Sequence, residues 1–414
     1  SLRVLWSLKN RVPHSHLDPE RRLALWCSAR DHLGRQPGPA RRRPYPTMRV
    51  HVLVLNYNGR RLLGQCLPSV VDAARASRHR CDVAVVDNDS HDDSLAWLER
   101  CFPQVRVIRR PNRGLCSFND VVPALEGPVA VLLNNDIKLA PDCIDPLVEP
   151  LVHSRSEGDS SCFMTAPWCR LFDGVTYEGL KTAVTWRWGL VQATALFPGH
   201  QAVVHIPGPT ASAGAVMAGD CAKFAALGGV DPLFLPGRLG DLDFAFRGYL
   251  AGYHARYVPA AVAYHRGMAT FGDVFGQSGC DQLALRNTLL FQWKNLRHPL
   301  HWARQWIGLP TRLAFDLVRA PWVPAARRWA LARALWGALA RWQRLRASPY
   351  RAKRNIRRER EFFRRFSPSR LASEATQVPR SSPPPMEEPA DPDLAACGTA
   401  ANALSNRSEL EAIL

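Results

Sequence analysis

The sequence lacks long apolar runs and paired cysteine motifs. No stretch approaches the roughly 20 consecutive apolar residues of a membrane-spanning helix, which argues against an integral membrane protein. The 11 cysteines stand singly, without the C-x-x-C spacing of zinc or redox sites. The first residues hold no continuous apolar segment and no small-residue cleavage site, so no secretory signal is predicted. These absences favour reduced thiols and a cytoplasmic location.

Acidic residues are few relative to basic ones: 36 Asp and Glu stand against 54 Lys and Arg, for a net charge of +18. Residues 286–366 hold 20 basic and 3 acidic residues, and residues 1–47 hold 10 basic and 3 acidic residues. Residues 367–414 have the opposite balance, with 3 basic and 7 acidic residues. The excess favours an anionic partner, which is a nucleotide, nucleic acid or an anionic membrane surface. No aromatic-and-basic sheet motif accompanies the charge, which disfavours nucleic acid.

Strands and helices alternate in the first half of the chain. Short apolar, β-branched runs predict buried strands at 49–59, 82–90, 105–110 and 128–136, and helical spacing predicts helices at 60–76, 94–101 and 116–125. This alternation predicts an α/β fold with a mostly parallel central sheet covered by helices on both faces. Residues 157–210 lack clean periodicity. Order returns at 212–265, with a strand, a short helix, a Gly-Gly loop, a helix with an acidic start and a final strand.

Polar residues follow each strand of the first half. They are Asn56 and Asn58, then Asp87, Asn88 and Ser90, then Asn112, and last Asn134, Asn135 and Asp136. In parallel sheets ligands bind beyond the carboxyl ends of the strands. One such cluster is readily explained by turns or helix caps. Four in register favour a shared ligand site.

Several short motifs occur in a recognisable order. They are VLNYNG at 54–59, VVDNDSHDDS at 85–94, NRG at 112–114 followed by Asn119, LLNND at 132–136, GGVDPLF at 228–234, GDLDFAFR at 240–247, GYHARYVP at 252–259 and a final His265. This ordered set resembles the family 2 glycosyltransferases, in particular bacterial rhamnosyltransferase-like members, over residues 48–295. The resemblance implies a GT-A fold with a mixed sheet, a UDP-, dTDP- or GDP-linked sugar donor, a divalent metal and inverting transfer.

By this resemblance, Asn134-Asn135-Asp136 stands at the acidic metal motif of the family, whose usual first Asp is absent here. Mg²⁺ or Mn²⁺ would neutralise the diphosphate leaving group. Asp136 is the expected carboxylate ligand, and His265 is implied as its partner. Asn134 and Asn135 would contact ribose or phosphate. The competing interpretation is a cap for a helix at 140–152.

The resemblance also assigns the remaining donor contacts. Asp87 would bind the base or ribose beside Asn88 and Ser90, with Asn56 and Tyr57 flanking the base. The loop carrying Asn112, Gly114 and Asn119 would approach the phosphates, since glycine permits close approach and a helix N-terminus favours anions. The alternative for Asp87 and Ser90 is capping of the next helix.

Asp241 is the predicted catalytic base. An inverting transfer needs one carboxylate that takes the proton of the acceptor hydroxyl. Gly240 stands where the family has a Glu, and Asp243 is expected to cap the helix or to pair with Arg247 four positions on. Trp186 and Trp188 would either stack on an acceptor sugar or serve packing.

The basic C-terminal third contains a candidate membrane helix at 328–346. One arc of this helix would carry Trp329, Leu331, Leu335, Trp336, Leu339 and Trp342, backed by arginines. That pattern is typical of a helix in a membrane interface, and packing against the catalytic domain is the alternative. The predicted segments are a poorly ordered extension (1–47), a nucleotide-binding half (48–152), an acceptor half (153–295), basic amphipathic helices (296–366) and a disordered tail (367–414).

The sequence thus favours an inverting glycosyltransferase that acts on a hydroxyl of a surface polysaccharide or lipid-linked saccharide, on the inner face of the cell membrane. Two alternatives remain open. One is a catalytically weak GT-A scaffold that binds membrane, favoured by the missing acids at Asn134 and Gly240. The other is a sugar nucleotidyltransferase, for which NYNGRR at 56–61 is a poor match to a glycine-rich phosphate loop.

Overall fold

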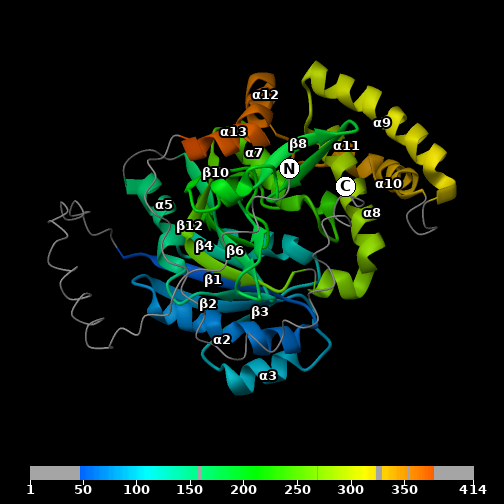
Figure 1. Ribbon diagram of the computed structural model, residues 1–414. Helices are drawn as coiled ribbons and strands as arrows, with labels where there is room; N and C mark the ends of the chain where they lie inside the picture. Colours follow the sequence, from blue (N-terminus) through cyan, green and yellow to red (C-terminus); the bar gives the residue numbers. More distant parts are fainter. Residues whose placement is uncertain (1–46, 157–160, 268, 323–328, 353, 377–414) are drawn as a thin grey trace, which may run out of the picture. The chain divides into compact units, whose positions relative to one another are not determined.

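The computed structural model describes residues 47–156, 161–267, 269–322, 329–352 and 354–376 (Figure 1). All of them belong to one compact unit that starts at Thr47. The predicted extension up to residue 46 and most of the predicted tail, from 377 onward, lie outside the described residues.

A ten-stranded sheet has the order β10-β12-β6-β11-β4-β1-β2-β3, with β5 paired to β12 and β7 to β6. Its strands are β1 (Arg49–Asn56), β2 (Arg80–Asp87), β3 (Arg106–Arg109), β4 (Val129–Asn134), β5 (Ile137–Leu139), β6 (Cys162–Leu171), β7 (Tyr177–Gly179), β10 (Gly208–Thr210), β11 (Val216–Asp220) and β12 (His254–His265). Six of them, β1, β2, β3, β4, β6 and β12, run in one direction, and the other four oppose them. The predicted mixed, mostly parallel sheet is confirmed.

The first half follows the predicted alternation of strands and helices. Helix α2 (Arg60–Ala76) matches the expected range, and α3 (Ser94–Cys101) and α5 (Ile144–Ser156) follow β2 and β5. Val50, Val52 and Leu53 of β1 are fully buried. Because neighbouring strand residues point to opposite faces of a sheet, both faces of β1 are covered. The helix expected at 116–125 is instead broken into η1 (Gly114–Ser117), α4 (Phe118–Val121) and η2 (Val122–Ala124). Pro123 explains the last break, because proline has no backbone N–H to continue the helix.

The second half places its helices beside the sheet. Helix α6 (Cys221–Ala226) begins at Asp220, whose carboxylate accepts the backbone N–H of Lys223 at 3.0 Å. After η4 (Pro232–Phe234), α7 (Gly240–Ala251) ends at Gly252, which has φ +106°. A left-handed residue of this kind is typically glycine. A separate hairpin is formed by β8 (Ala183–Arg187) and β9 (Leu190–Thr194), followed by η3 (His200–Ala202).

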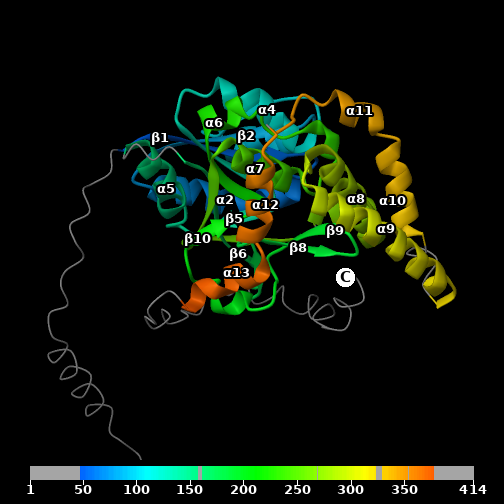
Figure 2. The same ribbon diagram turned by 90° about the horizontal axis from the view of Figure 1, so that it is seen from above.

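The C-terminal helices are α8 (Ala269–Asn295), α9 (Pro299–Arg319), α10 (Ala330–Leu339), α11 (Trp342–Ala347), α12 (Ile356–Arg365) and α13 (Pro368–Ala372), with the short turns η5 (Ala320–Trp322) and η6 (Ser373–Thr376). They share one hydrophobic core with α7 and the β8–β9 hairpin (Figure 2). Phe246 of α7, for example, meets Phe291 of α8 and Phe362 of α12 edge to face. No helix in the described part of the chain is long and apolar enough to cross a membrane.

Two predictions about this region are wrong. The helix expected at 328–346 is two helices, α10 and α11. Helix α10 buries Leu331, Ala334 and Ala338, whereas Trp329, Trp336, Leu339 and Trp342 of the predicted arc are exposed, as the membrane-interface interpretation requires. Trp336 is 75% exposed. The tail predicted from 367 begins with ordered structure instead: Leu371 of α13 is buried, and Glu374 pairs with the buried Lys181 at 2.7 Å. Amphipathic spacing identified helices here, but the buried side of each depended on its neighbours.

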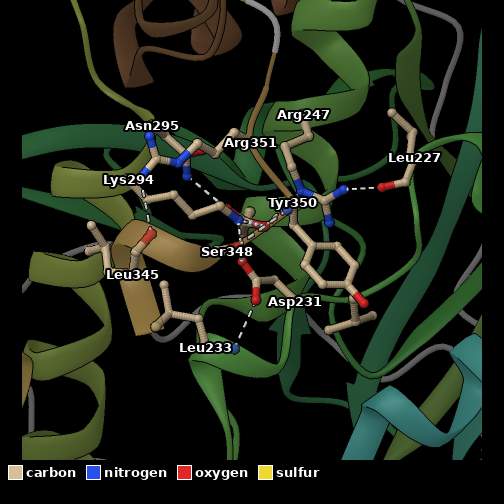
Figure 3. A network of polar contacts seen from close by, with 12 residues as sticks. Leu227, Asp231, Leu233, Arg247, Lys294, Asn295, Leu345, Ser348, Tyr350 and Arg351 are labelled. Atoms are coloured by element: carbon tan, nitrogen blue, oxygen red, sulfur yellow. Dashed lines mark hydrogen bonds and ion pairs between the residues drawn. The ribbon is translucent and has the colours of Figure 1, made fainter. Parts of the chain in front are cut away.

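A buried ionic network joins α7 to the C-terminal helices. The Lys294 ammonium of α8 lies 2.8 Å from Asp243 and 2.6 Å from Asp231, and all three side chains are almost fully buried. Asn295 donates to Asp243. Ser348 donates to Asp231 (Figure 3). The predicted Asp243–Arg247 pair is confirmed at 2.9 Å.

The cations of this network decide the charge state of Asp243. Burial raises the pKa of Asp243, but Lys294 and Arg247 outweigh burial and hold the pKa below its ordinary value. A lowered carboxyl pKa contributes stability that is present above the unfolded value of about 3.9. That contribution is lost as the pH falls through the lower folded value.

Lys294→Met tests this network. The variant leaves Asp231 and Asp243 buried without their shared cation, and such a loss costs about 3–5 kcal/mol of unfolding free energy. Denaturant unfolding at pH 7 measures it. The control Arg61→Met removes a cation from the exposed face of α2 and should change stability by less than about 0.5 kcal/mol. Equal effects of the two variants would contradict the assignment.

Candidate active site

Parallel pairing sets the ends of β1 and β2 side by side. Asn56 is in register with Asp87, and both side chains are buried. Asn56 Nδ2 donates to Asp87 Oδ1 at 3.2 Å and to Ser90 Oγ at 3.1 Å. Ser90 in turn donates to Asp87 from its hydroxyl at 2.6 Å and from its backbone N–H at 3.0 Å. Asp87 and Ser90 therefore brace the strand ends and do not cap α3, whose first turn bonds to Asp92.

The end of β4 joins the same network. Asn135 Nδ2 donates to Asn56 Oδ1 at 2.9 Å, so both ends of the Asn56 amide are occupied. Gly59 packs against this pair, since a Cβ at Gly59 would lie 2.0 Å from Asn135 Nδ2. The neighbouring Asn134 is half-buried, and Tyr57 is 39% exposed at the outer rim. Three strand ends thus form one polar edge.

Strand β5 brings His265 to this edge. It pairs with β12 so that Ile137 is opposite His265, which places Asp136 Oδ2 3.2 Å from His265 Nε2. The other ring nitrogen, Nδ1, lies 2.6 Å from Glu178 Oε1 of β7. Burial alone would lower the pKa of His265, but the hydrogen bonds to Asp136 and Glu178 outweigh it and raise the pKa to about 10. His265 is therefore a cation between two carboxylates at neutral pH.

Asp136 and His265 fit a divalent cation only in part. Asp136 Oδ1 is buried and has no hydrogen-bond partner in the described part of the chain, which suits an oxygen ligand. Across the described residues, however, no group of three His, Cys, Asp or Glu gathers as a metal cluster. A metal held here would take its remaining ligands from a bound anion, and His265 would have to release its proton to ligate.

Asp241 lies across a small cavity from the strand ends. It stands in the first turn of α7, half-buried, and Ser212 Oγ donates to Asp241 Oδ2 at 2.5 Å. The cavity is lined by Asp241 and Asn134 together with Leu132, Gly214, Ala215, Val230 and other apolar residues. The structure thus brings the predicted base and Asn134, the first residue of the predicted metal motif, to one cavity of about 20 Å³, whereas Asp136 is not among its lining residues.

The loop after β3 closes one side of this region. Asn112 Oδ1 accepts the N–H of Gly114, which has φ +52°, and Asn88 Nδ2 donates to the Gly114 carbonyl at 3.1 Å. Asn88 Oδ1 is buried and has no hydrogen-bond partner within the described residues. Asn119 is different. Its amide bonds to both backbone groups of Val230, at 2.8 and 2.9 Å, so it braces the Gly-Gly loop and does not face the strand ends.

The two tryptophans of the hairpin serve packing. Trp186 stacks on His301 of α9 with ring centroids 5.2 Å apart, and Trp188 stacks on Phe315 of the same helix at 5.2 Å. Of the two interpretations of these residues, packing agrees with the structure.

Sequence reasoning missed Glu178 and Ser212. Glu178 lies in the irregular segment 157–210, and Ser212 lies four residues before the first residue of β11, Val216. Neither residue belongs to a motif. Each contacts a partner that is distant in the sequence: Glu178 lies 87 residues from His265, and Ser212 lies 29 residues from Asp241.

Three comparisons with known proteins bear on this site. Residues 51–192 match the family model described as "Glycosyl transferase family 2". The chain is 30% identical over 116 residues to an undecaprenyl-phosphate 4-deoxy-4-formamido-L-arabinose transferase of Pseudomonas savastanoi pv. phaseolicola, covering 26% of this chain and 33% of the relative. The same enzyme of Pseudomonas syringae pv. syringae is 30% identical over 117 residues. The match thus spans about a third of these curated relatives.

Among solved structures, a mannosyltransferase from Pyrobaculum calidifontis in complex with GDP-Man and Mn²⁺ aligns over 86% of this chain and 93% of its own, at 16% identity and a TM-score of 0.43. GalNAc-T7 with UDP, GalNAc and Mn²⁺ aligns over 68% of this chain and 58% of its own, at 18% identity and a TM-score of 0.44. The family match, over residues that form the strand ends described above, agrees with the predicted α/β fold of the GT-A type. Residues 51–192 of this chain, about a third of its length, are thus similar to glycosyl transferase family 2.

Proposed function

We propose that this protein transfers a sugar from a nucleotide-diphosphate sugar to an acceptor hydroxyl with inversion at the anomeric carbon. The observation that carries the proposal is the shared cavity of Asn134 and Asp241, which joins the polar strand ends to a carboxylate on α7. A UDP-, dTDP- or GDP-linked donor fits the basic charge and the motif order, and the resemblance favours a rhamnosyl or related hexosyl group.

The donor would bind along the polar edge. Asn56, Asp87 and Ser90 bond to one another, so their first task is to hold the edge rigid for the base and ribose. Tyr57 offers an exposed aromatic face at the rim, and Asn88 offers a buried oxygen without a partner in the described residues. Asn112, Gly114, Asn134 and Asn135 would contact ribose or phosphate, whereas Asn119 supports the loop behind them.

Asp136 and His265 would hold Mg²⁺ or Mn²⁺ together with the donor diphosphate. Bound there, the metal would neutralise the charge that the leaving diphosphate develops. Glu178 would orient the His265 ring through Nδ1, as carboxylates commonly do for histidine ligands. The single protein carboxylate suits a metal that binds with the donor and not before it.

Asp241 would act as the base. Its carboxylate at the start of α7 would accept the proton of the acceptor hydroxyl as that oxygen attacks the anomeric carbon. Ser212 fixes one carboxylate oxygen by its hydrogen bond. The other oxygen remains for the acceptor.

A second, larger cavity supports an acceptor that carries phosphate. It has a volume of about 790 Å³ and lies between Asn112–Gly114, the segment 231–236 and the residues around α11. Arg113, Arg341 and Arg344 line it. Its one carboxylate, Asp231, is already paired with Lys294. Arg113 is likewise paired, with Asp120 at 3.1 Å, which leaves Arg341 and Arg344 to make the cavity net positive. This charge favours a lipid-linked saccharide over a neutral polysaccharide as acceptor.

A catalytically weak scaffold is the second candidate function. It is favoured by Gly240 and Asn134, which stand where the family places acids, and by the incomplete metal cluster. A sugar nucleotidyltransferase has no specific observation in its favour.

Asp241→Asn tests the base. The rate of nucleotide diphosphate release from a panel of nucleotide sugars, with Mn²⁺ and acceptor, should fall about 100-fold or more. Donor affinity should stay unchanged, because the base acts on the acceptor. Asp72→Asn, at an exposed position of α2, is the matched control. A variant as fast as the control would mean that Asp241 is not the base.

Asp136→Asn tests the metal site without an activity measurement. In the unchanged protein, Mn²⁺ and nucleoside diphosphate together should raise the melting temperature more than the sum of the two added singly. This synergy should vanish in the variant, because its amide is a poor ligand for a hard cation. Synergy that survives in Asp136→Asn would place the metal elsewhere.

Arg344→Gln tests the basic cavity. A lost charge-assisted contact to phosphate should raise the KM for a phosphate-bearing acceptor about tenfold with kcat unchanged. Arg346→Gln, two residues further on α11 and not lining the cavity, should leave KM unchanged. The assignment fails if both variants behave alike or if a neutral acceptor loses as much.

A further inference from the structure

Helix α9 presents its apolar side chains to solvent. Its buried residues are the polar His301 and Gln305. The large side chains of its outer face are instead exposed: Leu300 by 60%, Trp306 and Ile307 by 71% each, Leu317 by 59% and Val318 by 68%, followed by Trp322 of η5 by 78%. Single exposed apolar residues are common, but a contiguous set of this size marks an interaction surface.

The inner face of α9 is held by specific contacts that prevent the helix from turning this surface inward. His301 Nδ1 lies 2.6 Å from the buried Glu359 of α12. Gly308 packs on the hairpin so tightly that a Cβ there would lie 2.3 Å from the backbone nitrogen of Gly189. The outward orientation of Trp306 and Ile307 therefore follows from the fold.

Helix α10 extends the surface. A cavity lined by Leu313, Leu317, Trp329 and Ala332 shows that α9 and α10 lie side by side, as Figure 2 also shows. On α10 and just after it, Trp336 is 75% exposed, Leu339 48% and Trp342 46%. We call the exposed apolar residues of these elements the α9–α10 surface, and they are Leu300, Trp306, Ile307, Phe315, Leu317, Val318, Trp322, Trp329, Trp336, Leu339 and Trp342.

The charge around this surface is of one sign. Residues 299–347 contain nine arginines, at 304, 312, 319, 327, 328, 333, 341, 344 and 346, and one acid, Asp316. Asp316 is paired with Arg312 at 2.7 Å. Arg304 and Arg319 are exposed, and Arg319 lies over the ring of Phe315. Tryptophan and aliphatic residues bordered by arginines fit a partner that has an apolar interior and an anionic surface.

We propose that the α9–α10 surface docks on an anionic lipid bilayer. The apolar side chains enter the boundary between headgroups and acyl chains, where tryptophan is favoured. The arginines contact the lipid phosphates, each contributing attraction that salt screens. The proposal rests on the exposed face of α9, which the sequence prediction for 328–346 did not include, and it does not depend on the proposed transfer activity.

A second copy of this chain is a poorer occupant. In a two-fold interface the same surface meets itself, so arginines of one copy would face arginines of the other. Like charges across an interface disfavour association. Anionic lipid removes that conflict.

The test is flotation of the full chain with lipid vesicles. The chain should float with vesicles of equal parts phosphatidylcholine and phosphatidylglycerol, and much less with phosphatidylcholine alone. Raising the salt from about 0.1 M to about 1 M shortens the screening length from about 10 Å to about 3 Å and should weaken binding. The double variant Trp306→Ser/Ile307→Ser should lower the partition coefficient about tenfold or more.

Val175→Ser is the matched control, since Val175 is 75% exposed on a loop away from α9, and it should bind as the unchanged chain does. Circular dichroism should show that all variants keep the same fold. Binding that the double variant retains, or that ignores lipid charge, overturns the proposal. So does a dimer, seen by light scattering, that the double variant abolishes, because the surface would then be a contact between copies.

Discussion

The contact on which α7 and the C-terminal helices depend is the buried ammonium of Lys294 between Asp231 and Asp243. Removing charges from water is costly, and only close opposite charges and satisfied hydrogen bonds offset that cost. Here they do so by joining four separate segments: the loop after the Gly-Gly pair, α7, α8 and, through Ser348, the turn after α11. The network holds the first turn of α7 in place and with it Asp241, two residues before Asp243.

The first half of the sheet depends on the register of its strands. Because β1 pairs in parallel with both β2 and β4, three strands end at one level, and their polar residues bond to one another before any ligand binds. Such a preorganised edge loses little conformational entropy on binding. Strand register also positions His265, because the antiparallel pairing of β12 with β5 places His265 against Asp136.

The inner and outer faces of the C-terminal helices differ in role. Their inner faces complete the core that they share with α7 and the β8–β9 hairpin, as the contacts of Phe362 and Phe366 with Tyr249 show. Their outer faces, on α9 and α10, leave apolar side chains exposed among arginines. A helix that is needed on one side for stability can therefore carry a separate surface on the other, and α11 links that surface to the basic cavity.

The sequence by itself determined the alternation of strands and helices and the four polar strand ends, because these follow from local periodicity and spacing. It offered the Asp243–Arg247 pair as one of two roles for Asp243, and its ordered motifs resemble those of the family 2 glycosyltransferases. Only the tertiary structure decided that Glu178 and Ser212 meet His265 and Asp241, that Asn119 braces Val230, and which face of each C-terminal helix is buried. The physical reason is that these contacts join residues far apart in the chain, and such contacts exist only after the sheet and helices have packed.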